Sequence, residues 1–148
     1  MAVTITALRG EDHAEWLELW KAYLAFYETE LDDATTQVTF ERMTSFPPEI
    51  HGAIARDADG RAVGLVHCLT HPATWSTGGY CYLEDLFVAA DARSSGAGEA
   101  LIEYVRAWAE QQGATKVYWL TAETNSVARR LYDRVATRSG FIHYEIKL

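Results

Sequence analysis

One glycine-containing segment combines residue types that bind anions. It reads Arg93-Ser-Ser-Gly96-Ala-Gly98 and joins an apolar, strand-like stretch to a helical pattern. Glycine has no Cβ, so a ligand can approach the backbone closely, and the first amides of a helix lack intrahelical acceptors. Strand, glycine turn and helix start therefore predict a phosphate site, most naturally for a pyrophosphate, with Arg93 as a fixed cation. The alternative is a loop that serves only as a turn.

Two widespread phosphate motifs can be compared with this segment, and neither matches it. The dinucleotide fingerprint requires Gly or Ala three residues after its second glycine, where this chain has Leu101. The P-loop ends in Gly-Lys followed by Ser or Thr, whereas Gly98 is followed here by Glu99.

Two neighbouring carboxylates, Glu84 and Asp85, interrupt an apolar stretch that predicts a strand over 80–88. Burying an unpaired carboxylate costs free energy, so either one is a candidate site residue. Successive residues of a strand face opposite sides of a sheet, so we expect only one of them to reach a substrate. We assign Glu84 to hold an ammonium and accept its proton, and Asp85 to make structural hydrogen bonds. Pairing with a nearby Arg or Lys is the structural alternative for both.

Asn125 and Tyr132 lie seven residues apart in a predicted helix, for which Asn125 is a candidate N-cap. Seven steps of about 100° return to the same helix face, so both side chains can point at one ligand. A phenol with a pKa of about 10 is protonated at neutral pH and can donate its proton to a leaving group. The alternative for Tyr132 is an ordinary half-buried aromatic residue.

The first predicted helix, over 13–28, brings aromatic rings and acidic side chains together. Tyr23, Tyr27, Glu28 and Glu30 could form a wall that binds an aliphatic amine through cation–π and ion-pair contacts. Trp75 is a further candidate for this wall. In the alternative reading the two tyrosines are core residues and the acids are solvated.

These residues are spread over a predicted series of strands and helices. We expect strands at 3–8, 51–56, 62–70, 80–88, 116–121 and 140–148, and helices at 13–28, 39–44, 99–112 and 126–136. Asp57-Ala-Asp-Gly60 is typical of a hairpin turn, and Gly113 of a helix C-cap. The order predicts a mixed α/β domain built on one sheet, with no linker long enough to divide residues 1–148.

Composition indicates a globular chain and narrows its partners. The 148 residues are 49% hydrophobic, and 13 Lys and Arg against 21 Asp and Glu give a net charge of −8. Such a chain lacks the basic surface that binds nucleic acid or anionic membranes, and its negative charge would attract cations. The alternative is that the charge only keeps the protein dissolved.

Neither a span of about 20 apolar residues nor a secretory signal is seen, so we expect a cytoplasmic protein with reduced Cys68 and Cys81. His67 and Cys68 should face opposite sides of their strand, so no metal site is predicted.

The quoted segments resemble those of a known family. Segment 93–98, Arg-x-x-Gly-x-Gly after an apolar strand, resembles the acetyl-coenzyme A pyrophosphate loop of the GCN5-related N-acetyltransferase (GNAT) superfamily. Segment 117–132 resembles that family's other cofactor-binding motif. Segments 71–75 and 81–87 are similar to the branch that acetylates polyamines and histone tails, and the likeness covers nearly all of 62–148.

The resemblance implies a GNAT fold: a single mixed, mostly antiparallel α/β sheet of about six to seven strands flanked by about four helices, splayed between its two central strands. The pantetheine arm of acetyl-CoA would pair with exposed backbone in that gap, and the diphosphate would rest on the glycine segment. The residues implied to bind the cofactor are Leu86, Phe87, Val88, Arg93, Ser94, Ser95, Gly96, Ala97, Gly98, Glu99, Asn125, Ala128, Arg129 and Tyr132.

The resemblance also implies an acetyl-CoA-dependent N-acetyltransferase in which a primary amine of a small, polyamine-like cation attacks directly. Glu84 would assist deprotonation, and Tyr132 would protonate the leaving thiolate. The residues expected around the acceptor are Tyr23, Tyr27, Glu28, Trp75 and Glu84. The alternatives are a protein lysine or N-terminal acetyltransferase and a non-catalytic CoA-binding module. Relatives of this branch are often dimers, so a homodimer is expected.

Overall fold

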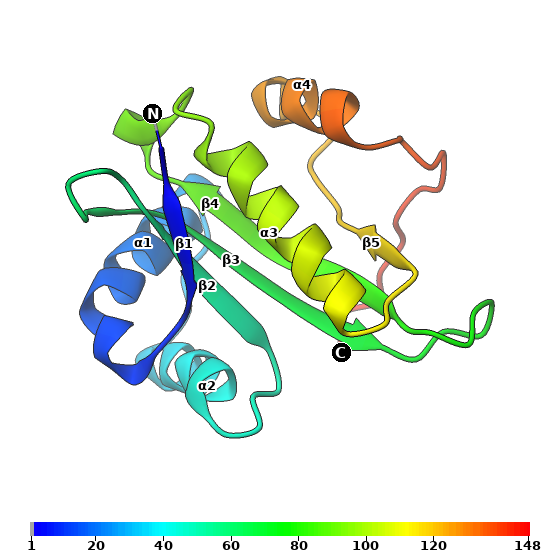
Figure 1. Ribbon diagram of the computed structural model, residues 1–148, viewed down its shortest axis with the longest axis horizontal. Helices are drawn as coiled ribbons and strands as arrows, with labels where there is room; N and C mark the ends of the chain where they lie inside the picture. Colours follow the sequence, from blue (N-terminus) through cyan, green and yellow to red (C-terminus); the bar gives the residue numbers. More distant parts are fainter. Residues whose placement is uncertain (1) are drawn as a thin grey trace. The chain divides into compact units, whose positions relative to one another are not determined.

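The computed structural model describes residues 2–148, and its packing falls into two compact units, one ending at Tyr118 and the other formed by Trp119–Leu148. The first unit contains a five-stranded sheet whose spatial order is β1-β2-β3-β4-β5 (Figure 1). Its elements are β1 (Thr4–Ala7), η1 (Gly10–Asp12), α1 (His13–Phe26), α2 (Asp33–Thr44), β2 (His51–Arg56), β3 (Ala62–His71), β4 (Tyr80–Val88), η2 (Ala90–Ala92), α3 (Ala97–Gln111) and β5 (Lys116–Tyr118). Strands β1 to β4 pair antiparallel, and β5 joins β4 in parallel.

The sheet confirms the mixed, mostly antiparallel α/β class, but two details of the expectation are wrong. Five strands form instead of six to seven, and the parallel pair β4–β5 is the last pair rather than the central one. This pairing joins only Tyr80–Tyr82 of β4 to Lys116–Tyr118. Within residues 2–148, β4 therefore has no strand neighbour on that side over 83–88, which leaves the expected gap beside it.

Helices pack on both faces of the sheet. Helices α1 and α2 lie on one face, which we call the α1 face, while α3 lies along β3 and β4 on the other face (Figure 1). The largest apolar cluster fills the α1 face and consists of Leu8, Trp16, Leu19, Trp20, Phe40, Met43, Ile54, Leu65 and Phe87. Removing this surface from water is the main force that holds α1 against β3 and β4.

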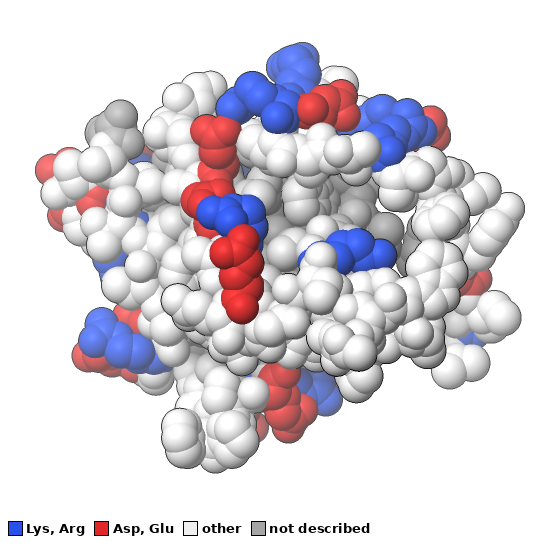
Figure 2. Space-filling view, turned by 45° about the vertical axis from the view of Figure 1, so that its right-hand side comes forward, with Lys and Arg blue, Asp and Glu red and all other residues white. Residues whose placement is uncertain are grey.

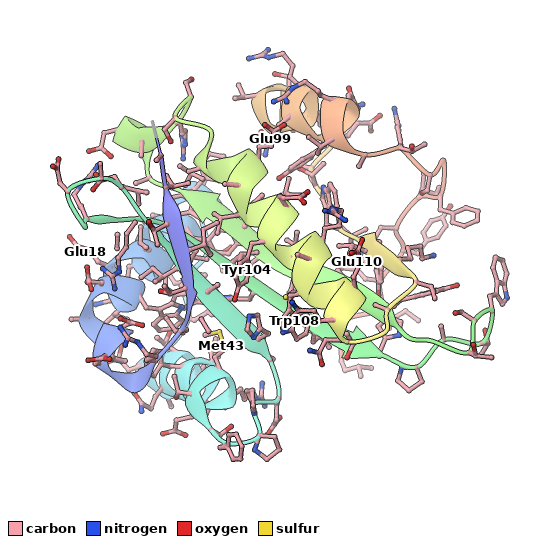
Figure 3. All side chains as sticks on the ribbon, viewed as in Figure 1. Glu18, Met43, Glu99, Tyr104, Trp108 and Glu110 are labelled. Carbon is pink, nitrogen blue, oxygen red and sulfur yellow. The ribbon has the colours of Figure 1, made fainter. Side chains whose placement is uncertain are left out.

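A glycine in β3 lets α3 approach the sheet closely. A Cβ at Gly64 would lie 3.1 Å from Leu101 Cδ1 of α3 and 2.9 Å from the carbonyl oxygen of Phe87 in β4. Farther along α3, Tyr104 and Trp108 reach toward β2 (Figure 3), where the ring of His51 stacks on Trp108 with centroids 4.6 Å apart. Helix α3 therefore packs on β3 and β4 and also contacts β2 at His51.

The exposed side of α3 carries charges of both signs. Arg106 forms ion pairs with Glu103 and Glu110, and Figure 2 shows opposite charges side by side in a column on the surface it presents. The net charge of −8 is therefore not gathered into one acidic patch on this view of the molecule.

Capping residues explain where several helices begin and end. Helix α2 begins at Asp33 rather than at 39, because the Asp32 carboxylate accepts a hydrogen bond from the Thr35 amide at 2.7 Å. The predicted hairpin turn is confirmed, with Gly60 at φ 84°. The predicted C-cap is also confirmed, since Gly113 follows α3 at φ 80°.

The second unit contains α4 (Ser126–Val135). Asn125 caps this helix as predicted, because its Oδ1 accepts from the Ala128 amide at 3.4 Å. The strand expected over 140–148 is wrong, since residues 137–148 have no regular secondary structure, and β5 ends at Tyr118 rather than at 121. A strand forms only where a neighbour completes its hydrogen bonds, and an alternating apolar pattern does not supply that neighbour.

Candidate active site

A bulge in β4 decides where the two carboxylates point. His67 of β3 is opposite Asp85, whereas the next residue, Cys68, is opposite Leu83, so Glu84 is an extra residue in the ladder. Leu83 lies on the same side of the sheet as Cys68, which is the α3 side. A bulge interrupts the alternation of side chains, so Glu84 and Asp85 both lie on the α1 face with His67. The prediction that Glu84 and Asp85 face opposite sides is therefore wrong.

Asp85 is the centre of a buried hydrogen-bond chain. Its Oδ1 accepts from the Tyr23 hydroxyl at 2.7 Å, and its Oδ2 lies 2.9 Å from Nδ1 of His67. On the other side of that ring, Trp16 Nε1 donates to His67 Nε2 at 3.0 Å. Burial and the charge of Asp85 raise the pKa of Tyr23 well above its ordinary value, so this phenol keeps its proton and acts as a donor. The structural hydrogen bonds expected of Asp85 are present.

Glu84 stands beside this chain and differs from Asp85 in its environment. Burial raises the pKa of the Glu84 carboxyl, and the negative charge of Asp85 raises that pKa further. His67 and then the guanidinium of Arg42 act on that pKa in the opposite direction. A carboxylate that binds its proton more tightly than usual is suited to general-base work closer to neutral pH.

Tyrosine rings continue the α1 face toward β5, and the sequence analysis missed them. Tyr82 stacks on Tyr118 with ring centroids 5.0 Å apart, and Lys116 Nζ lies 3.9 Å from the centre of the Tyr80 ring. Burial raises the pKa of Tyr82, and the charge of Glu84 contributes to the shift. Two-residue spacing of these aromatic and acidic positions along β4 was the signal that could have found them. We call the rings and the two carboxylates together the aromatic–acidic surface.

The predicted acceptor wall is only partly assembled. Tyr23 and Tyr27 meet at this surface in a T-shaped contact with ring centroids 5.1 Å apart. Burial raises the pKa of Tyr27, and the charge of Asp85 raises it further. Trp75 is 80% exposed on the connection between β3 and β4 and makes no ring contact within residues 2–148. Glu28 belongs to a separate open hollow of about 690 Å³ at the end of α1, lined by Lys21, Leu24, Ala25, Glu28, Thr29, Glu30 and Leu31.

The glycine segment has the backbone geometry of an anion site. Ser94 and Gly96 both take left-handed conformations, at φ 71° and 86°, and α3 begins immediately afterwards at Ala97 rather than at 99. Such turns direct successive amides to one concave side, next to the partial positive charge of the helix start. The guanidinium of Arg93 lies over two phenylalanine rings, 5.4 Å and 5.7 Å from their centres, which holds it at this loop.

The open edge of β4 leads directly into the glycine segment. The Ala89 amide donates to a β3 carbonyl at 2.8 Å, and bonded residues alternate along an antiparallel strand. Phe87 therefore pairs with β3, while the peptide groups of Leu86 and Val88 point to the open edge. The Val88 carbonyl accepts from Arg93 Nε at 3.2 Å, which agrees with that direction. An extended ligand could add to this edge as a further strand would.

The C-terminal unit carries the other predicted ligand-binding residues on and next to α4. Asn125 uses its side-chain oxygen to cap the Ala128 amide, and Arg129 Nη1 donates to a backbone carbonyl of the same unit at 2.7 Å. The ring of Tyr132 meets Trp119 edge-on with centroids 5.4 Å apart. One short helix therefore carries both Asn125 and Tyr132, as their spacing predicts.

Two further features concern membranes and metals. Residues 2–148 include no helix with the length and apolar content needed to cross a bilayer. Over the same residues, no three His, Cys, Asp or Glu side chains gather as metal ligands do.

Comparisons with known proteins relate this geometry to a family. The family model described as the acetyltransferase (GNAT) family matches residues 14–136. The chain is 33% identical over 144 residues to the D-amino-acid N-acetyltransferase HPA3 of Saccharomyces cerevisiae. This alignment covers 97% of this chain and 89% of the relative. Among solved structures, the ribosomal-protein-alanine N-acetyltransferase of Brucella melitensis biovar Abortus 2308 aligns over 100% of both chains with a TM-score of 0.82 and 24% identity. AAC(6')-Iy in complex with the bisubstrate analogue CoA-S-monomethyl-acetylneamine aligns over 100% of this chain and 99% of that chain, with a TM-score of 0.85 and 18% identity.

The family match runs through the bulged strand and the glycine segment of the first unit and through α4 of the second. It confirms the resemblance drawn from the sequence, and the acetyl donor of this family is acetyl-CoA. The chain therefore belongs to the acetyltransferase (GNAT) family and is an acyltransferase that uses acetyl-CoA.

Proposed function

We propose that this enzyme transfers the acetyl group of acetyl-CoA to a primary amine of a small cationic acceptor such as a polyamine. The observation that carries the proposal is the bulge, which puts Glu84 and Asp85 on the α1 face among the rings of the aromatic–acidic surface. Adjacent carboxylates attract an ammonium, and aromatic faces bind it through cation–π contact. The net charge of −8 favours the approach of such a cation.

A second acceptor class, the amine of an amino acid, is favoured by the 33% identity to a D-amino-acid N-acetyltransferase. This acceptor carries a carboxylate, which needs a cation near the two acids. Arg42 supplies one, because its charge acts on the Glu84 carboxyl. A protein lysine or N-terminus, and CoA binding without catalysis, are the remaining alternatives.

The described residues offer what acetyl-CoA needs. The open edge of β4 presents peptide groups to the amides of the pantetheine arm, and the glycine segment presents amide donors to the diphosphate. The contacts proposed along this path are Leu86, Phe87, Val88, Arg93, Ser94, Ser95, Gly96, Ala97, Gly98 and Glu99. Those proposed in the C-terminal unit are Asn125, Ala128, Arg129 and Tyr132. Because the family match runs across both units, we take residues 1–148 as one acetyltransferase domain.

The proposed reaction assigns proton transfer to Glu84 and Tyr132. Glu84 accepts a proton from the bound ammonium, which gives the nitrogen its lone pair. Acetyl-CoA supplies the acetyl group as a thioester, so the nitrogen bonds to the carbonyl carbon, the carbon–sulfur bond breaks and the thiolate leaves. Tyr132 donates its phenolic proton to that sulfur, and the resulting phenolate takes the second proton that the nitrogen gives up as it becomes an amide. Glu84 then releases its proton to solvent. The side chains proposed to hold the acceptor are Tyr23, Tyr27, Glu28, Trp75 and Glu84.

Thiol release from acetyl-CoA tests the acceptor class. The purified chain is incubated with polyamines, D- and L-amino acids and lysine peptides, and we expect polyamines to give the highest kcat/KM. If thiol release is faster with amino acids or peptides, the acceptor belongs to that class instead. If no amine raises thiol release above the rate of hydrolysis, acetyl transfer to amines is contradicted.

A variant of Tyr132 separates catalysis from binding. Tyr132→Phe should lower turnover by about 100-fold and leave the Kd for CoA nearly unchanged in calorimetry. Tyr104→Phe is the matched control, because Tyr104 lies on the α3 side of the sheet. Equal turnover in the Tyr132→Phe variant and the parent enzyme would remove Tyr132 from the mechanism.

We also propose a homodimer. The C-terminal segment exposes apolar side chains at alternate positions, with Ile142, Tyr144 and Ile146 at 72%, 85% and 89%. Such a pattern is typical of a strand that pairs, and a second copy offers the same segment for two-fold association. Sedimentation equilibrium should give twice the chain mass of 16.6 kDa, and Ile142→Lys with Ile146→Lys should give the monomer. A monomeric parent chain would contradict the proposal.

We further propose a cytoplasmic location. Cys68 and Cys81 are both buried as unpaired thiols, as expected in a reducing compartment. Cell fractionation tests this location, and recovery of the chain outside the cytoplasmic fraction would contradict it.

A further inference from the structure

The buried hydrogen-bond chain that passes through Asp85 contains more members than a substrate contact needs. It joins Trp16 and Tyr23 of α1, His67 of β3 and Asp85 of β4 by three hydrogen bonds of 2.7–3.0 Å. We propose that Trp16 and His67 are positioning residues which orient the Asp85 carboxylate beside Glu84, and that the charge of Asp85 makes Glu84 the proton acceptor of the pair. The inference rests on the proposed function and assigns different roles to the two adjacent acids.

The indole of Trp16 selects one tautomer of His67. An indole N–H can donate a hydrogen bond but cannot accept one. Because Trp16 Nε1 points at Nε2 of His67 at 3.0 Å, that nitrogen carries a lone pair and the proton of the ring is on Nδ1. Nδ1 therefore donates to Asp85 Oδ2 at 2.9 Å. In this tautomer the contact between His67 and Asp85 is a hydrogen bond donated by the imidazole.

Both oxygens of Asp85 are engaged by donors. Oδ2 accepts from His67, and Oδ1 accepts from the Tyr23 hydroxyl at 2.7 Å. Hydrogen bonds to an ionised carboxylate favour that ionised form. The Asp85 side chain is only 16% exposed. Both oxygens of Asp85 thus have their donors in place before an amine arrives.

Glu84 is the carboxyl that the charge of Asp85 acts on. It is the bulge residue, next to Asp85 on the same face. Two carboxyl groups side by side do not ionise equally, because each negative charge disfavours the second. Burial and the charge of Asp85 therefore raise the pKa of Glu84 toward the working pH, where a general base is most effective. The charged and titratable groups that face Glu84 are Asp85 and Tyr82 of β4, His67 of β3, Tyr23 of α1 and Arg42 of α2.

The chain itself offers a matched control for the Trp16 indole. Trp20 is also a buried tryptophan of α1, and its ring centroid lies 5.3 Å from that of His67. Within the described residues, however, its Nε1 has no hydrogen-bond partner. Trp16→Phe and Trp20→Phe therefore make the same change in the same helix, and only Trp16→Phe removes the donor to His67.

The first measurement needs neither substrate nor turnover. Nitrogen NMR of the His67 imidazole, assigned by comparison with His67→Gln, should show the neutral ring with its proton on Nδ1 and a lone pair on Nε2. Trp16→Phe should increase the population of the tautomer with its proton on Nε2, and Trp20→Phe should leave the tautomer unchanged. A proton on Nε2 in the parent protein overturns the inference.

The second measurement follows the Glu84 carboxyl. Carbon NMR of protein labelled at the glutamate carboxyls, assigned with Glu84→Gln, gives the pKa of Glu84 directly. Asp85→Asn keeps the shape of the side chain and removes its charge, so it should lower the pKa of Glu84 by about one unit or more. The acidic limb of kcat/KM should move to lower pH by a similar amount.

The two measurements separate this inference from the proposed function. An unchanged Glu84 titration in Asp85→Asn overturns the inference even in an enzyme that acetylates polyamines. If no amine is acetylated but both sets of NMR changes occur, the proposed function is contradicted and the arrangement of the two acids is supported. Asp85→Asn also decides the question if Trp16→Phe does not fold.

Discussion

The hydroxyl of Tyr23 on α1 donates a hydrogen bond to Asp85 on β4 at 2.7 Å, across 62 residues of sequence. The same tyrosine ring stacks on Trp20 and meets Phe87 edge-on, so it belongs to the apolar layer of the α1 face. One side chain therefore contributes both to the core and to the orientation of a carboxylate at the candidate active site.

Removing this hydroxyl should cost stability. Tyr23→Phe keeps the ring and leaves Oδ1 of Asp85 without its donor, so the free energy of unfolding in urea should fall by about 1.5–3 kcal/mol. Tyr27→Phe on the same helix is the control, because its ring is 45% exposed and the expected change is below about 0.5 kcal/mol. Equal changes in the two variants would show that the contact with Asp85 contributes little.

Glu84→Gln should remove the general base. We expect kcat/KM to fall by roughly 10²–10⁴-fold at neutral pH, and the acidic limb of the pH profile to disappear. Glu110→Gln on the exposed side of α3, labelled in Figure 3, should keep the parent activity. A Glu84→Gln enzyme that keeps both the rate and the acidic limb would show that another group takes the proton.

The same substitution should make the folded protein more stable near neutral pH. Burial and Asp85 raise the pKa of Glu84 in the folded state, so the folded protein binds this proton more tightly than the unfolded chain does. The contribution of Glu84 to stability is then lost as the pH rises through its folded pKa. Urea midpoints measured across pH should show a gain for Glu84→Gln at pH 7 that shrinks toward about pH 4. A gain that grows as the pH falls would contradict the direction of the shift.

Gly96→Ala should disturb the anion-binding turn. The residue has φ 86°, and a Cβ in this left-handed conformation costs roughly 1–2 kcal/mol although it would meet no atom within 4 Å. Calorimetry should therefore show weaker binding of acetyl-CoA, by several-fold, together with a lower urea midpoint. Gly10→Ala, which also meets nothing within 4 Å but lacks a positive φ, should change neither. Unaltered binding in Gly96→Ala would argue that this turn does not hold the diphosphate.

Gly64→Ala should separate α3 from the sheet. The added methyl group would lie 2.9 Å from the Phe87 carbonyl oxygen and 3.1 Å from Leu101 Cδ1. Overpacking of this kind costs about 1–3 kcal/mol, and thermal unfolding should show a lower Tm. A Tm equal to that of the parent would mean that the helix moves aside without cost.

Local patterns predicted most elements but not all of their ends. The strands expected over 51–56 and 80–88 are β2 and β4 with the same bounds, because period-two patterning and turn residues act within the segment itself. The cap at Asn125 follows from its neighbours in the same way. The start of α2 was missed because the Asp32 cap that fixes it was not recognised.

The sequence by itself determined the features that depend on neighbours along the chain. The left-handed turn before α3 and the helix cap before Tyr132 are of this kind, since backbone conformation and capping act over a few residues. Tertiary structure alone decided which side Glu84 faces, because the bulge is a property of the register between β3 and β4 and resets the alternation that sequence reading assumes. It also decided the partners of His67, which come from separate elements. The absence of a strand over 140–148 has the same origin, because a strand's hydrogen bonds are completed by its neighbours.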